Sequence, residues 1–140
     1  MREMYNLYLK MWRNYAVFTG RAPRKEVWAA LLGNLCLFLA FYIVCFVVGA
    51  VAGIVDYVIA SDSFSGLVIF FLGIADILLT LAAILPCLGI LVRRLHDTGK
   101  SGWKILILIV PVVGILILLF DLYLLKGTNG PNLYGEDPLK

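Results

Sequence analysis

Three long apolar blocks limit what this chain can fold into. Residues 29–55 contain no charged side chain, residues 64–92 contain only Asp76, and residues 105–125 contain only Asp121. About 20 mostly apolar residues cross the hydrocarbon core of a bilayer, so each block is long enough to span it. A soluble helix instead presents polar residues to water at regular intervals, and these blocks lack them. The sequence therefore predicts an integral membrane protein.

We expect an all-α fold, a single-domain membrane bundle of three helices with an N-terminal amphipathic helix at the membrane interface. Tyr5, Tyr8, Trp12 and Tyr15 recur at helical spacing, and aromatic rings favour the headgroup level. The alternative is that this aromatic stripe packs on the protein itself. The expected segments are an interfacial helix within 1–22, spans at about 27–55, 64–92 and 103–125, and a turn-rich tail over 126–140.

The distribution of charge predicts the orientation. Six basic residues precede the first span, whereas the loop over 56–63 has two acids and no base. The second loop is basic again, and the two lysines of the tail are balanced by Glu136 and Asp137. The positive-inside rule then places the N-terminus and the second loop in the cytoplasm and the C-terminus outside.

The charged turn over 93–103 permits a structural and a functional interpretation. In the first, arginines bond Asp97 along the helix, Gly99 ends that helix and Ser101 caps the next. In the second, a basic cytoplasmic rim binds anionic lipid or a phosphorylated ligand, because arginine matches phosphate geometry. The candidate lipid- or phosphate-binding residues are Arg21, Arg24, Lys25, Arg93, Arg94, His96, Asp97 and Lys100.

Two intramembrane carboxylates suggest a different function. Ionisable groups inside a span are costly and are functional candidates, and folding the second and third spans about the charged turn brings Asp76 level with Asp121. Together they could hold a proton or a cation. In the alternative, Asp121 reaches the outer interface near Lys126, and Asp76 bonds a neighbour such as Thr80.

Other classes of function have little support. Because no nucleophile lies beside a partner base, we expect no catalytic residue. The three cysteines form no metal-ligand spacing, so we expect neither a metal nor a cofactor. A net charge of +3 is too small to indicate nucleic acid binding. Small residues such as Gly49 and Gly53 leave homo- or hetero-oligomers possible through close helix packing.

Several motifs together resemble one known family. They are the hairpin run RRLHDTGKSGW, the segment from Gly20 to Trp28, the proline of the third block and the closing GTNGPNLYGEDP. This pattern resembles the bacterial inner-membrane family called domain of unknown function 805, which tends to have Ser where this chain has Pro23. The resemblance implies a small, multi-helix protein of the bacterial cytoplasmic membrane and implies no activity.

Our principal functional expectation is a non-enzymatic, multi-pass protein of the bacterial inner membrane. It would act as an interaction or envelope-associated module whose basic rim contacts anionic lipid headgroups or a partner. The alternative is a small transporter or channel component that uses the two intramembrane carboxylates, Asp76 and Asp121.

Overall fold

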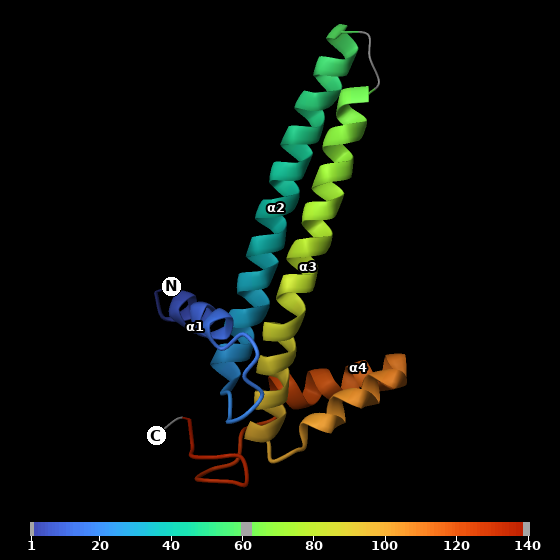
Figure 1. Ribbon diagram of the computed structural model, residues 1–140. Coiled ribbons are helices and arrows are strands. Elements are labelled where there is room, and N and C mark those ends of the chain that lie inside the picture. The colour runs from blue at the N-terminus through green and yellow to red at the C-terminus, as the bar shows by residue number, and fades with distance from the viewer. Residues whose placement is uncertain (1, 60–62, 139–140) are drawn as a thin grey trace. The chain divides into compact units, whose positions relative to one another are not determined.

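The computed structural model describes residues 2–59 and 63–138, and within them the chain is helical without a β-strand (Figure 1). Residues 1–33 and 84–140 form one compact unit, and residues 34–83 form the other. In chain order the elements are α1 (Arg2–Arg13), α2 (Arg24–Ile59), α3 (Ser63–Asp97), the 3-10 helix η1 (Gly102–Ile109), α4 (Pro111–Leu119) and the π-helical turn η2 (Phe120–Leu124).

Helices α2 and α3 contain the first two predicted spans. They are 36 and 35 residues long, and at 1.5 Å per residue each exceeds the roughly 30 Å of hydrocarbon in a bilayer. Their apolar side chains are turned outward, with Phe46 77%, Ile54 63% and Phe70 62% exposed. A large apolar surface without protein cover is unfavourable in water and suits lipid. Both helices therefore fit transmembrane segments.

Polar contacts within the 34–83 unit hold the neighbouring ends of these helices. The Asp56 carboxylate accepts hydrogen bonds from the backbone N–H groups of Phe64, at 3.2 Å, and Ser65, at 2.8 Å. It satisfies donors that the first turn of α3 would otherwise leave unpaired. Further along, Tyr42 Oη donates to Asp76 Oδ1 over 3.3 Å. The partner of Asp76 is therefore a tyrosine on α2, rather than the Thr80 suggested from the sequence.

The segment predicted as a third span is not one long helix. Helix η1 ends at Ile109, Val110 has an extended backbone (φ −96°, ψ 93°), and α4 then begins with Pro111 in its first turn. Figure 1 shows α4 doubling back along the segment before it. Two short helices and a π-helical turn thus occupy the segment that the sequence predicted as one span over 103–125, and a three-helix bundle is not confirmed.

Sequence features explain this reversal. Pro111 starts a helix, because its missing N–H is not needed in a first turn. Gly114 lies against the carbonyl of Ile107, where a Cβ atom would overlap the backbone. A glycine at this point lets the two short helices approach closely. The result is a helical hairpin over 102–124.

Helix α1 packs against the protein. Met11 is fully buried in a core with Ala22, Val27, Ala30 and Ile90. Tyr8 lies so close to Gly33 that a Cβ atom there would overlap its ring. These contacts support the alternative in which part of the aromatic stripe faces the protein, whereas Tyr5 remains 62% exposed.

Candidate anion-binding site

Asp97, the last residue of α3, joins two buried arginines. One carboxylate oxygen accepts from Arg21 Nε over 3.0 Å, and the other pairs with Arg94 Nη1. Their side chains are nearly inaccessible, at 2% exposed for Arg21, 1% for Arg94 and 5% for Asp97. A buried charge must be paired and hydrogen-bonded to be tolerated. We call these three residues the Asp97 cluster.

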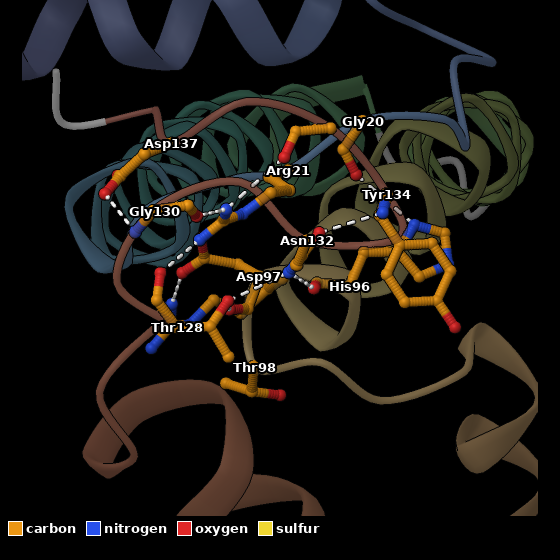
Figure 2. A network of polar contacts seen from close by, with 12 residues as sticks. Gly20, Arg21, His96, Asp97, Thr98, Thr128, Gly130, Asn132, Tyr134 and Asp137 are labelled. Atoms are coloured by element: carbon orange, nitrogen blue, oxygen red, sulfur yellow. Dashed lines mark hydrogen bonds and ion pairs between the residues drawn. The ribbon is translucent and has the colours of Figure 1, made fainter.

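The C-terminal tail completes this cluster (Figure 2). Arg21 Nη1 donates to the carbonyl of Gly130 and Nη2 to that of Thr128, both over 2.6 Å. Arg94 is also saturated, because it donates to the carbonyls of Leu122 and Leu125. These guanidinium groups are occupied by the protein itself and have a structural role.

The tail also bonds the end of α3 directly. Thr128 N–H donates to the Asp97 carbonyl over 2.8 Å, and Asn132 Nδ2 donates to the His96 carbonyl over 2.9 Å. The His96 ring stacks on Tyr134, with centroids 3.9 Å apart and planes 2° from parallel, as Figure 2 shows. Its Nδ1 lies 3.3 Å from the carbonyl of Gly20. His96 is thus held in place by hydrogen bonds and by ring stacking.

The tail contacts do not support the expected orientation. The sequence placed the charged turn in the cytoplasm and the tail over 126–140 outside. Because Thr128 and Asn132 bond the end of α3, the tail lies against the charged turn instead of apart from it. The positive-inside count assumed a third crossing that the hairpin over 102–124 does not make as one helix.

A second buried acid, Glu26, collects other cations. It pairs with Lys10 of α1, and its second oxygen lies 3.9 Å from Arg93 Nη1. Arg93 was expected to reach Asp97 along the helix, but it faces Glu26 instead, while Arg94 makes the expected bond three residues away. Glu26, in the first turn of α2, therefore connects α1 to the last part of α3.

The carboxylate of Asp121 lies at the charged turn. It pairs with Lys100, just before the hairpin, and with Lys104 in its first helix, whereas Asp121 itself lies in the last turn of the hairpin. Burial raises the pKa of Asp121, but hydrogen bonds from the two lysines outweigh burial and hold it below its usual range. Neither sequence interpretation, which set Asp121 beside Asp76 or near Lys126, included these two lysines as its partners.

A basic pocket adjoins the Asp97 cluster. Its volume is about 340 Å³, within the range of sites for small molecules. Five of its lining side chains are cationic and two are acidic, so their formal charges leave three positive charges in excess. The charged lining residues are Arg21, Arg24, Lys25, Arg94, Lys126, Asp97 and Asp137.

Three of these cations remain available to a ligand. Arg24 donates through Nε to the carbonyl of Leu125 and through Nη2 to that of Leu124, which leaves Nη1 without a partner among the described residues. Lys25 makes only an exposed pair with Glu3, at 3.2 Å. Lys126 is exposed and makes no ion pair within the described part of the chain. We call Arg24, Lys25 and Lys126 the open cations.

The pocket contains five of the eight candidates expected from the sequence. Arg21, Arg24, Lys25, Arg94 and Asp97 line it. The other three, Arg93, His96 and Lys100, bond Glu26, the tail and Asp121 instead. Sequence reasoning missed Lys126 and the tail because it assigned both to the opposite side of the membrane. The dense turn residues of the tail were the available signal of an ordered segment.

This chain resembles known proteins over most of its length. The family described as "Protein of unknown function (DUF805)" matches residues 15–136. The chain is 37% identical over 131 residues to the inner membrane protein YhaI of Escherichia coli K12, covering 94% of this chain and 93% of the relative. It is 33% identical over 132 residues to YhaH of the same strain, covering 94% of each. No solved structure matches the chain.

The family match spans most of the sequence, and it includes the charged turn, the hairpin and the tail to Glu136. The two relatives are named inner membrane proteins, and the two long apolar helices of this chain fit transmembrane segments. The resemblance noted from the motifs is confirmed. The chain belongs to the membrane protein family described as "Protein of unknown function (DUF805)".

Proposed function

We propose that the protein is a non-enzymatic membrane module that binds a phosphate-bearing anion, such as the headgroup of an anionic lipid, in the basic pocket. The observation that carries this proposal is the excess of cations in a pocket of about 340 Å³. The open cations supply charge that no protein carboxylate at the pocket neutralises fully. A guanidinium edge and two ammonium groups suit the several oxygens of a phosphate.

The topology we propose has two spans, with both termini and the pocket on the cytoplasmic side. Helix η1 has 8 residues and α4 has 9, so at about 2.0 and 1.5 Å per residue each arm covers roughly half of a ~30 Å hydrocarbon core. The ion pairs of Asp121 with Lys100 and Lys104 hold the two ends of the hairpin together. A segment with joined ends and short arms fits a re-entrant hairpin.

Labelling of single cysteines tests the topology. In a chain whose native cysteines are replaced by serine, we expect Leu133→Cys in the tail, 97% exposed, to react with an impermeant maleimide only in inside-out vesicles. Ser63→Cys at the start of α3 should react only from the opposite side. Reaction of both variants from the same side, or of Leu133→Cys from the periplasmic side, would contradict two spans with a cytoplasmic tail.

Phosphate binding tests the function. In an uncharged detergent, inorganic phosphate should raise the unfolding temperature above that in chloride at equal ionic strength. Lys126→Gln should weaken phosphate binding about fivefold, since one cation contributes roughly 1 kcal/mol near such charge. Arg13→Gln is the matched control, because Arg13 is exposed, loses the same charge and lies outside the pocket. Equal loss in both variants would refute a specific site.

The transport hypothesis is weaker on this structure. Asp121 bonds two lysines at the charged turn, so it is not free to share a proton with another carboxylate. Asp76 alone, bonded by Tyr42, does not make a pathway. We therefore propose binding and no second function.

A further inference from the structure

An apolar groove lies beside the basic pocket in the same unit. Its volume is about 510 Å³ and its accessible lining is almost entirely apolar. It is open along one side, so an elongated molecule can lie in it without being enclosed. Its walls are Trp28 and Leu31 of α2, Leu116 and Leu119 of α4, and Tyr123 and Leu124 of η2.

The groove and the pocket share a boundary at one contact. Leu124 lines the groove, and its carbonyl accepts a hydrogen bond from Arg24, which lines the pocket. Trp28 is one helical turn beyond Arg24 on α2, about 6 Å along the axis. Lys126 follows Leu124 by two residues and lines the pocket again. A molecule with an anionic end and an apolar end can therefore occupy both cavities across this boundary.

Aromatic packing keeps the groove in shape. The rings of Trp28 and Tyr123 meet edge to face, with centroids 4.9 Å apart. Trp28 is still 42% exposed, so one part of its ring packs on Tyr123 and the remainder is accessible from the groove. Aromatic side chains with one polar edge suit the level where headgroup and acyl chain meet. The groove is thus pre-formed next to the open cations.

We propose that the site binds one anionic phospholipid, with its phosphate at the open cations and an acyl chain in the groove. This inference rests on the proposed phosphate site and adds the apolar half of its ligand. Charge complementarity selects the headgroup, and the adjoining apolar walls select a long chain over a free phosphate. In the proposed topology both parts lie at the cytoplasmic leaflet, where such a lipid is available.

Native mass spectrometry with two lipids of the same headgroup tests this inference. The probes are palmitoyl-oleoyl phosphatidylglycerol and dihexanoyl phosphatidylglycerol, titrated against the full-length protein in an uncharged detergent. We expect the long-chain lipid to bind about tenfold more tightly or better, since burying even a few methylene groups supplies that difference. Leu119→Trp, which fills the groove, should remove most of the preference. Leu39→Trp is the matched control, because Leu39 lies outside the groove and is similarly exposed (52% against 47%).

The outcomes separate the two proposals. If Lys126→Gln weakens both lipids while Leu119→Trp changes neither, the phosphate site stands and the chain-binding groove is refuted. If Lys126→Gln changes neither lipid nor inorganic phosphate, the phosphate site fails as well. If Leu119→Trp abolishes a protein dimer without changing lipid binding, the groove belongs to a second copy and the lipid inference is overturned. Leu31→Trp fills the groove from the α2 wall, so it separates the effect of filling the groove from a local folding defect in α4.

Discussion

Replacing Asp97 with asparagine tests the energetic role of the Asp97 cluster. The asparagine has nearly the same shape, but it removes the carboxylate that pairs with both Arg21 and Arg94. Both guanidinium groups would stay at 1–2% exposure without their counter-charge. Breaking a buried ion pair by removing one partner costs about 3–5 kcal/mol. Since asparagine keeps part of the hydrogen bonding, we expect the lower end, about 3 kcal/mol.

The free energy of unfolding can be measured by SDS titration in mixed micelles. The matched control is Glu3→Gln, which also removes one carboxylate from an ion pair. The pair of Glu3 with Lys25 is 69% and 67% exposed, and such pairs contribute roughly 0–1 kcal/mol. The reasoning is refuted if the Asp97→Asn variant loses no more stability than Glu3→Gln.

Two further predictions concern the tail and the hairpin. Gly127→Ala should destabilise the protein by about 1–3 kcal/mol, because the new Cβ atom would overlap the carboxylate of the Asp97 cluster. Gly73→Ala should not destabilise the protein, because the space around Gly73 is open. Equal losses of unfolding free energy for the two variants in SDS titration would contradict the close approach of Gly127 to Asp97. Because its two lysines lower the pKa of Asp121, this carboxylate stabilises the fold above the unfolded pKa near 3.9. That contribution is lost as pH falls further, so Asp121→Asn should reduce stability at pH 7 and flatten its decline below about pH 4, and an unchanged acid profile would contradict this.

The first two spans could be predicted because their signal is local. The blocks over 29–55 and 64–92 lack the polar residues of a soluble helix. Each block lies within one long helix of the structure, the first within α2 and the second within α3. The third block has the same composition but folds into a hairpin. Hydropathy measures how apolar a segment is and does not report a reversal between Ile109 and Pro111. Pro111 in a helix and Pro111 at the start of one are equally compatible with the sequence.

The site was predictable where spacing along one helix decides it. Arg94 and Asp97 are three residues apart, so their bond follows from helical geometry. The bond between Arg21 and Asp97 joins residues 76 positions apart, and the sequence offers only the weaker expectation that both lie on one rim. The position of Lys126 in this pocket was not predicted, because an orientation argued from charge counts depends on the number of crossings.

The docking of the tail has a consequence for biogenesis. Arg21 precedes its acceptors at Thr128 and Gly130 by 107 and 109 residues, so both acceptors are synthesised long after it. Until they are made, this guanidinium lacks two of its carbonyl partners and the tail cannot dock. A chain terminated before Thr128 would contain both long apolar helices without these acceptors. Synthesis of the tail is thereby coupled to assembly of the pocket.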